Sequence, residues 1–329
     1  MNIYDIAREA GVSITTVSRV LNGREGVSPR TRARVEAVLA RNHYAPSAIA
    51  RGMVSNSLRT VAVLTVDVRV PHYARTAYTI ERELSRRGYD VTLCNTGGVL
   101  KEAVRYLRVV TEKKVDGIVL VGSVFNRIGK DAEVLGLLRG VPVVLANGLL
   151  ELPGSYSVLV NDAHGVALAV DHVFDRGKRA PVYLKDRDTA SAAAKRDGFL
   201  DALARHGVKD PARRVVETGE RLEDAVQAVE KLLAANTAFD AVVCGEDLTA
   251  AGALKALLRA GLRVPQDVAV TGFNNSEYAR VCEPALTTVD NKPELVAMLS
   301  VQLLESLIEK TGAYSSVTIQ PELVRGGTT

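Results

Sequence analysis

The sequence predicts a small unit of three helices, containing a helix-turn-helix, followed by a larger body of two α/β lobes with parallel, doubly wound sheets. Three observations support this fold class. Apolar residues recur at helical spacing over residues 1–42, buried-strand runs alternate with helical segments from residue 60 onward, and a second such series begins near residue 181. The 329 residues suffice for two or three folded units, and 47% hydrophobic residues allow each to bury a core.

A glycine turn separates the first two predicted helices. A helix over 3–10 ends at Gly11, where a tight turn requires a positive φ. Ser13 offers an oxygen that can cap the second helix, which runs to about Asn22. Two short helices joined in this way are typical of a helix-turn-helix, although an ordinary αα-hairpin has the same pattern.

The third helix begins at Ser28, an N-cap residue that is followed by Pro29 at the first helical position. The apolar stripes of the three helices can close one small core. Its predicted members are Ile6, Val17, Val20, Leu21, Val35 and Leu39.

Positive charge is concentrated at the start of the chain. Residues 1–60 hold nine Arg, no Lys and four acidic residues, a net charge of +5, whereas the whole chain carries +4. The remainder is therefore at −1. A basic unit attached to a nearly neutral body is typical of a nucleic-acid binder with a separate function elsewhere, although an Arg-rich soluble surface has the same composition.

The body consists of alternating strands and helices, which favours parallel sheets. The predicted strands lie at 61–66, 91–94, 117–121, 141–145, 157–160, 181–184, 213–217, 241–244, 268–271, 286–289 and 317–319. The predicted helices lie at 72–87, 100–113, 131–138, 162–176, 190–206, 221–235, 247–260 and 293–310.

Two lobes facing each other place a crevice at the carboxyl ends of their strands, where hinge closure can trap a small polar molecule. The predicted divisions are a DNA-binding unit at 1–45, a linker at 46–58 and the body at 59–329. Within the body, lobe 1 covers about 59–160 and 290–320, and lobe 2 covers about 161–289.

Several classes of protein are disfavoured. The sparse, odd set of Cys94, Cys244 and Cys282 argues against a disulfide framework and a zinc site, so we expect reduced and mostly buried thiols. The amphipathic start is no secretory signal, and no apolar run reaches eighteen residues, so we expect a cytoplasmic, nucleoid-associated protein with no membrane contact. Without a G-x-G-x-x-G, P-loop or G-x-S-x-G motif, and with five scattered His, we expect no enzyme, catalytic residues, cofactor or metal.

Several stretches match one known family over nearly the full length. The chain resembles the lactose-repressor/galactose-repressor (LacI/GalR) family of bacterial transcription regulators, whose body is similar to periplasmic sugar-binding proteins. The matching stretches are Ile3–Ala7 with Gly11–Ser13 and Thr16–Asn22, Val27–Arg32, Tyr44–Arg51, Val115–Ile118, Gly198-Phe199, Gly261–Pro265, Thr271–Phe273 and Pro284–Val289.

The resemblance implies that the second helix lies in the major groove of double-stranded DNA. Ile14, Thr15 and Arg19 would then face base edges, and Arg19 suits guanine O6 and N7. For the hydroxyl residues, helix capping is the alternative. The residues that would contact phosphates are Tyr4, Ser13, Thr16, Ser18, Asn22 and Arg30.

The linker corresponds to the family's hinge. Two turns of helix over 46–55 are unstable alone in water, so we expect this stretch either to be a plain linker or to fold on DNA. Ala50 and Met53 would enter the minor groove, with Met53 at the position of the family's Leu wedge. A dimer on a pseudo-palindromic operator is implied. Because residues 321–329 carry no heptads, we expect a homodimer and no coiled-coil tetramer.

The resemblance also implies a small-molecule effector between the lobes. Lys195 stands where the family usually has Arg, and Asn274 where it often has Asp, which favours an anionic ligand such as a sugar phosphate or sugar acid over a neutral sugar. A cleft that binds nothing is the alternative, as is simple helix capping by Asn161 and Glu246. The predicted effector residues are His72, Tyr73, Asn161, Ser191, Lys195, Glu246 and Asn274.

The leading hypothesis is therefore a repressor whose operator affinity is set by a sugar-like effector. A second hypothesis is a family regulator whose signal is a partner phosphoprotein on a basic patch at Arg82, Arg86 and Arg87, which a solvated helix face also explains. A cytoplasmic solute-binding module is a third. Whether the effector is an inducer or a co-repressor, and which operator is bound, are left open by the sequence.

Overall fold

The structure is a computed structural model that describes residues 2–21, 23, 25–42, 58–312 and 314–329. The chain divides into two compact units, which are treated separately below: residues 1–60 with 114–116, and residues 61–113 with 117–329. The expectations for Asn22, Ala50, Met53 and the linker at 46–57 lie outside the described residues.

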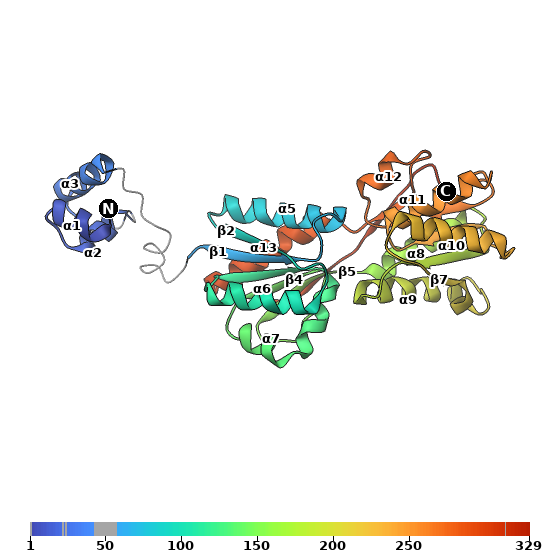
Figure 1. Ribbon diagram of the computed structural model, residues 1–329, viewed down its shortest axis with the longest axis horizontal. Helices are drawn as coiled ribbons and strands as arrows, with labels where there is room; N and C mark the ends of the chain where they lie inside the picture. Colours follow the sequence, from blue (N-terminus) through green and yellow to red (C-terminus); the bar gives the residue numbers. More distant parts are fainter. Residues whose placement is uncertain (1, 22, 24, 43–57, 313) are drawn as a thin grey trace. The chain divides into compact units, whose positions relative to one another are not determined.

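The described part of the N-terminal unit contains three helices, as predicted (Figure 1): α1 (Ile3–Glu9), α2 (Ile14–Leu21) and α3 (Pro29–Arg41). Gly11 has the expected positive φ, 61°, which reverses the chain after α1. The Oγ of Ser28 accepts a hydrogen bond from the amide of Thr31 at 3.2 Å and so caps α3.

The core of this unit follows the predicted stripes with small differences. Ile6, Val17 and Val35 are fully buried, whereas Leu21 and Leu39 only pack against the edge of the cluster. Small residues complete the interior between the helices. They are Ala7 of α1, Ala10 at the end of α1, and Val38 of α3.

The first lobe is a six-stranded sheet with strand order β11-β5-β4-β3-β1-β2, in which the neighbours from β11 to β1 pair in parallel. Its strands are β1 (Thr60–Thr65), β2 (Asp90–Asn95), β3 (Gly117–Val121), β4 (Val143–Ala146), β5 (Ser155–Val160) and β11 (Val317–Ile319). The three central strands β1, β3 and β4 are buried almost throughout, because helices cover both faces.

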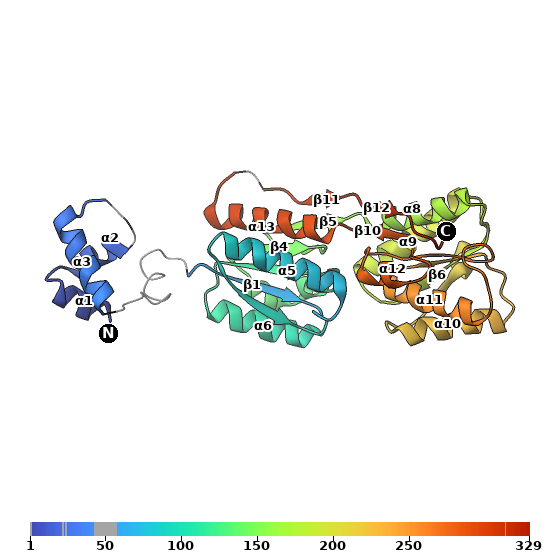
Figure 2. The same ribbon diagram turned by 90° about the horizontal axis from the view of Figure 1, so that it is seen from above.

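In Figures 1 and 2, helices α5 and α13 cover one face of this sheet, and helices α6 and α7 cover the other. These helices are α5 (Pro71–Arg86), α6 (Leu100–Glu112), α7 (Ala132–Leu137) and α13 (Pro293–Glu309), and the 3-10 helix η1 (Ser123–Lys130) precedes α7. The chain thus returns to the first lobe after completing the second.

The second lobe is a four-stranded parallel sheet with order β7-β6-β8-β9. Alternate residues of its strands supply two separate cores: Val182 and Leu184 face one, and Tyr183 faces the other. The strands are β6 (Pro181–Lys185), β7 (Val215–Glu217), β8 (Ala241–Cys244) and β9 (Ala269–Thr271). The helices are α8 (Asp162–Asp175), α9 (Ala190–Arg205), η2 (Pro211–Arg214), α10 (Leu222–Ala234), α11 (Asp247–Arg259) and α12 (Glu277–Val281).

Three described segments connect the lobes, following β5, β10 (Thr288–Asp290) and β11. After β11 the chain enters the second lobe, where β12 (Glu322–Val324) pairs antiparallel with β10. Four elements were absent from the predicted set, namely η1, η2, α12 and β12. Each has eight residues or fewer, too few for a clear hydrophobic period.

A test of the packing uses Gly198, where α9 crosses α8. A Cβ atom here would lie 2.2 Å from the carbonyl oxygen of Ala163, a backbone atom that cannot turn aside. Gly198→Ala should therefore destabilise the body by about 1–3 kcal/mol in urea denaturation. Gly136→Ala in α7, which meets no atom within 4 Å, is the control and should be neutral or slightly stabilising; equal losses in both variants would contradict close packing at Gly198.

Candidate effector site and DNA-binding surface

The outer face of α2 carries the residues expected to read bases. Ile14, Thr15 and Arg19 are all exposed, while Val17 and Val20 on the opposite face are buried. Because Ile14 is a large apolar residue with 39% of its surface exposed, it is available for contact with an apolar partner such as a thymine methyl group.

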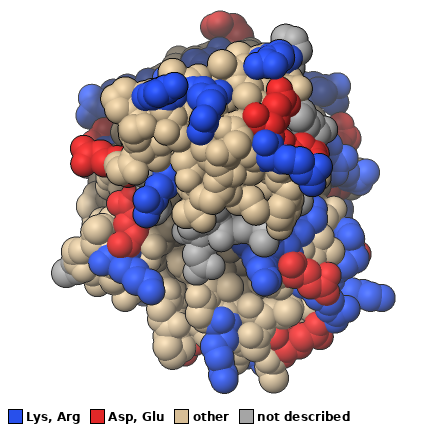
Figure 3. Space-filling model, turned by 90° about the vertical axis from the view of Figure 1, so that its left-hand side faces the viewer, with Lys and Arg blue, Asp and Glu red and all other residues tan. Residues whose placement is uncertain are grey.

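The residues expected at phosphates have mixed local roles. Tyr4 is 63% exposed and Arg30 is exposed, so both side chains are open to a ligand. The Oγ of Ser13 accepts a hydrogen bond from the amide of Thr16 at 3.2 Å and lies 2.9 Å from its hydroxyl, so capping already employs both groups. Ser18 is half-buried. In Figure 3 blue Lys and Arg side chains alternate with acidic and uncharged ones and form no single continuous patch.

A cavity of about 40 Å³ lies between the lobes, and we call it the inner cavity. Six of the seven predicted effector residues line it: His72, Tyr73, Ser191, Lys195, Glu246 and Asn274. Asn161 does not. Its Oδ1 accepts a hydrogen bond from the amide of His164 at 3.1 Å, and its Nδ2 donates to Gln320. Asn161 therefore caps α8, which is the alternative role considered for it from the sequence.

Lys195 is buried and already bound within the second lobe. Its Nζ donates to the carbonyl oxygen of Gly245 at 2.8 Å and lies 3.9 Å from the centre of the Phe273 ring. The ammonium is therefore anchored at the base of the inner cavity by a dipole and an aromatic face. It contributes positive potential there, and one of its three N–H donors is used by the carbonyl oxygen of Gly245.

The first lobe contributes an aromatic pair. His72 and Tyr73 stand in the first turn of α5, with ring centres 3.9 Å apart and planes tilted by 46°. Tyr73 packs over Gly122, where a Cβ would lie 2.8 Å from the tyrosine ring, so a residue without a side chain is needed. Burial lowers the pKa of His72 well below its usual value, so this imidazole is neutral near pH 7.

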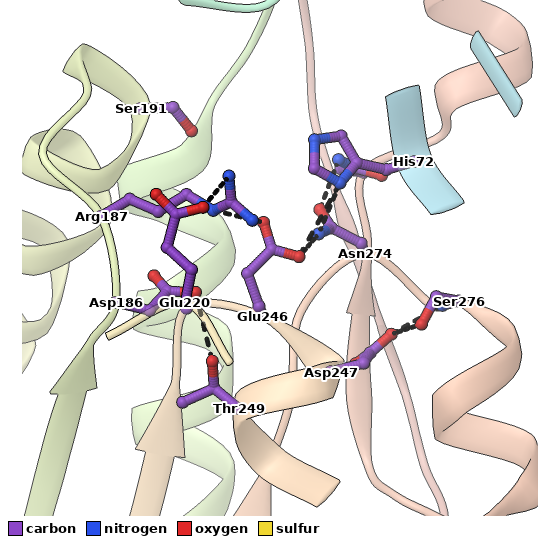
Figure 4. A network of polar contacts seen from close by, with 12 residues as sticks. His72, Asp186, Arg187, Ser191, Glu220, Glu246, Asp247, Thr249, Asn274 and Ser276 are labelled. Atoms are coloured by element: carbon purple, nitrogen blue, oxygen red, sulfur yellow. Dashed lines mark hydrogen bonds and ion pairs between the residues drawn. The ribbon is translucent and has the colours of Figure 1, made fainter. Parts of the chain in front are cut away.

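Glu246 and Asn274 contact each other inside the cavity, where the amide of Asn274 is the hydrogen-bond donor and the carboxylate of Glu246 is the acceptor. The Asn274 amide nitrogen donates to Glu246 and lies 3.3 Å from His72 Nδ1, which links the two lobes (Figure 4). The Asn274 oxygen accepts from Asn291 Nδ2 at 2.8 Å. The other amide atom of Asn291, its Oδ1, is buried without a hydrogen-bond partner and is free to accept one from a ligand.

The sequence reasoning missed Asp186 and Arg187, which follow β6 and also line the inner cavity. Figure 4 shows Arg187 between two carboxylates: its guanidinium lies 3.0 Å from Glu220, and its Nε lies 3.9 Å from Glu246. No motif marks Arg187 in the sequence. The available signal was its position at the carboxyl end of a predicted strand, where α/β sheets bind ligands.

Buried carboxyl groups surround this site. Burial, reinforced by the charge of Glu246, raises the pKa of Asp186 to about 6. Burial also raises the pKa of Asp247 to about 6, although hydrogen bonds from Thr288 and Ser276 oppose the shift. The charged forms of these groups are therefore costly in the folded state.

Polar contacts join the lobes around the cavity rim. The amide of Ser191 donates to the hydroxyl of Ser123 at 3.1 Å, and Arg127 donates to the carbonyl oxygen of Asp188 at 2.5 Å. These contacts pair η1 of the first lobe with the start of α9 in the second. The body is thus in a closed arrangement.

The arginines proposed as a patch for a protein partner are engaged locally. Arg86 and Arg87 both bind Glu83 at 2.8 Å, and Arg87 also lies 3.1 Å from Glu305. Arg82 lies 5.6 Å from the centre of the Tyr78 ring. Among the described residues there is no cluster of His, Cys, Asp and Glu fit for a metal ion, and no helix with the length and apolar character to span a membrane.

Comparison with known proteins identifies the class first. Residues 2–47 match the model of bacterial regulatory proteins of the lacI family, and residues 170–329 match that of the periplasmic binding protein-like domain. An HTH-type transcriptional regulator of Lachnoclostridium phytofermentans is 34% identical over 100% of this chain and 99% of its own. The transcriptional repressor PurR of Mannheimia succiniciproducens is 30% identical over 98% of this chain and 96% of its own.

Solved structures have the same architecture. A Lac repressor bound to ONPG in its repressed state superposes with a TM-score of 0.87 at 24% identity, covering 100% of this chain and 99% of that one. A complex of the transcriptional regulator CelR with cellobiose gives a TM-score of 0.73 at 26% identity, with both chains covered in full. The chain belongs to the lacI family of bacterial regulatory proteins. It is a transcriptional regulator with a DNA-binding helix-turn-helix unit and a periplasmic-binding-protein-like body, as the sequence predicted, and not an enzyme.

The raised pKa of Asp186 predicts a pH dependence of stability. Its folded pKa of about 6 exceeds the ordinary 3.8, so the stability that depends on this carboxyl group is fully present below pH 3.8, where the group is protonated in the folded and unfolded states. That part of the free energy of unfolding is lost as the pH rises through 6. At 1.36 kcal/mol per pH unit, the loss is roughly 3 kcal/mol. Asp186→Asn should remove this loss when urea denaturation is compared at pH 4 and pH 7.

The neighbouring Asp188, whose side chain is 91% exposed, supplies the control. Asp188→Asn should follow the pH dependence of the wild-type protein. If Asp186→Asn also followed it, the buried carboxyl group would not titrate as described.

Proposed function

We propose that this regulator is a repressor that binds a pseudo-palindromic operator as a homodimer and that a neutral, sugar-like effector in the inner cavity controls its operator affinity. The charge balance around that cavity carries the choice of effector. Its lining holds two cations, Arg187 and Lys195, and two carboxylates, Asp186 and Glu246. Both cations already have partners in the protein.

This arrangement disfavours the anionic effector that the substitutions at Lys195 and Asn274 suggested. A ligand anion would meet Glu246 and Asp186 without gaining a free cation, and its desolvation would be poorly compensated. A polyhydroxyl compound instead can donate to carboxylates and to Asn291 Oδ1, and can accept from Arg187 Nε. Apolar lining residues suit the faces of a sugar ring: Tyr73, Val121, Ala146, Val160 and Val296.

The DNA-binding proposal rests on the exposed face of α2. Ile14, Thr15 and Arg19 are offered as base readers, and Tyr4 and Arg30 as phosphate contacts. Effector binding would shift the population of closed and open bodies, and coupling of about 1–3 kcal/mol to the operator-competent state suffices for ordinary control.

Arg19 and Arg30 provide a matched pair of substitutions for the DNA proposal. After an operator is selected from randomised duplexes, Arg19→Ala should cost about 1–3 kcal/mol on that operator, relax preference at one base pair, and leave binding to random DNA less affected. Arg30→Ala should weaken both duplexes alike and reduce the slope of affinity against salt by about 1 per subunit. Equal losses on both duplexes for Arg19→Ala would refute its base-reading role.

The effector proposal is tested by thermal denaturation of the full chain with matched ligands: neutral aldoses, the corresponding sugar acids and the corresponding sugar phosphates. A neutral sugar at one hundred times its Kd should stabilise the body by about 2.7 kcal/mol, and its charged analogues should stabilise it less. Glu246→Gln removes one carboxylate and should narrow this difference. Preferential stabilisation by an acid or phosphate would overturn the neutral effector.

A further inference from the structure

A second hollow adjoins the inner cavity. This outer groove, of about 490 Å³, lies between the start of α5 and the second lobe. One layer of side chains separates the two hollows, because five residues line both of them. These residues are His72, Asp186, Arg187, Glu246 and Asn274. We call the connected residues His72, Asn274, Glu246 and Arg187 the partition.

The partition is continuous from one lobe to the other. His72 contacts Asn274, Asn274 donates to Glu246, and Glu246 lies 3.9 Å from Arg187 (Figure 4). Arg187 is its outer end, fixed by Glu220, whose side chain is 59% exposed. The partition therefore depends at this end on an ion pair in contact with water, which is the weakest kind of attachment.

Arg187 also has an unused donor. Its Nε is buried without a hydrogen-bond partner, although the guanidinium is charged. An unsatisfied charged donor is costly, and a ligand oxygen in the inner cavity would satisfy it. The side chain thus faces the effector and closes the cavity at the same time.

The outer groove has a lining that suits a further sugar ring. Tyr278 and Leu248 offer apolar surface, and Arg221 and Glu220 offer hydrogen-bonding groups. The inner cavity, by contrast, has room for about three water molecules in this closed arrangement. The lobes must separate slightly to admit even one ring, and a longer ligand must also cross the partition.

We propose that Arg187 sets the upper size limit of the effector: with Arg187 in the partition the site takes a single sugar ring, and displacing Arg187 joins the inner cavity to the outer groove so that a two-ring sugar fits. This inference rests on the proposed sugar effector. It adds a specificity-determining residue and a second subsite to it.

The first experiment measures affinity for a length series, a monosaccharide and the disaccharide and trisaccharide built from it, by calorimetry on the full chain. Arg187→Ser should bind the disaccharide at least tenfold more tightly than the wild-type protein does. Glu220→Gln, which only releases Arg187 from its exposed partner, should give a smaller gain. Arg69→Ser is the control, because Arg69 lines the same groove, is 87% exposed and pairs with Asp67; it should keep the wild-type preference.

The second experiment uses no sugar. Ala192→Cys places a thiol in the inner cavity, and its labelling is followed with a bulky maleimide, with the parent chain as the blank for Cys94, Cys244 and Cys282. Adding Arg187→Ser should raise the labelling rate at least tenfold; adding Arg69→Ser should leave it unchanged. A rate unchanged by Arg187→Ser, or an unchanged length preference, would overturn the size limit. If no sugar binds either protein, the sugar effector fails while the labelling rate still decides the partition.

Discussion

The site depends on one buried carboxylate that is itself outside the inner cavity. Asp247 accepts hydrogen bonds from the amide of Ser276 at 2.6 Å, from its hydroxyl at 2.8 Å, and from the hydroxyl of Thr288 at 2.5 Å. These contacts bind the start of α11 to the loop after β9 and to the strand that returns to the first lobe. Glu246 precedes Asp247 and Asn274 lies in that loop, so the same contacts hold these two side chains against each other.

This constraint explains a local requirement of the sequence. A Cβ at Gly272 would lie 2.3 Å from the Asp247 carboxylate, so the strand end can approach only as glycine. The amide of Asp247 also donates to the carbonyl oxygen of Phe273 at 3.0 Å. Strand β9 and helix α11 are thereby fixed at the one edge where the second lobe faces the first, and the site inherits its rigidity from backbone contacts.

Charge balance is the second organising feature. Lys195, Arg187, Asp186 and Glu246 enter one small cavity, and each is held by a neighbour in the second lobe. The first lobe contributes the neutral His72, most of the apolar lining and uncharged polar residues such as Ser123 and Asn147. Inside the cavity, a charged surface of the second lobe therefore faces an uncharged surface of the first lobe.

The sequence alone determined the elements. The spacing of apolar residues predicted the three helices, the alternating strands and most of their bounds, because a helix or strand buries one face and its apolar residues recur with its own period. The cap residue Ser28 and the turn at Gly11 were also predictable from the sequence, because their roles involve only residues nearby in the chain. The family resemblance predicted seven effector residues, of which six line one cavity in the structure. It did not show that the seventh, Asn161, caps a helix instead.

Tertiary structure decided which partners those side chains have. The sequence placed Lys195 and Asn274 in the predicted effector site, but only the fold shows that they donate hydrogen bonds to Gly245 and Glu246, which lie far away along the chain. No motif marked Arg187, because its role arises only where the start of α5 meets the carboxyl ends of β6 and β8. Pairing across the fold sets charge balance and cavity size, and neither quantity is local to any stretch of sequence.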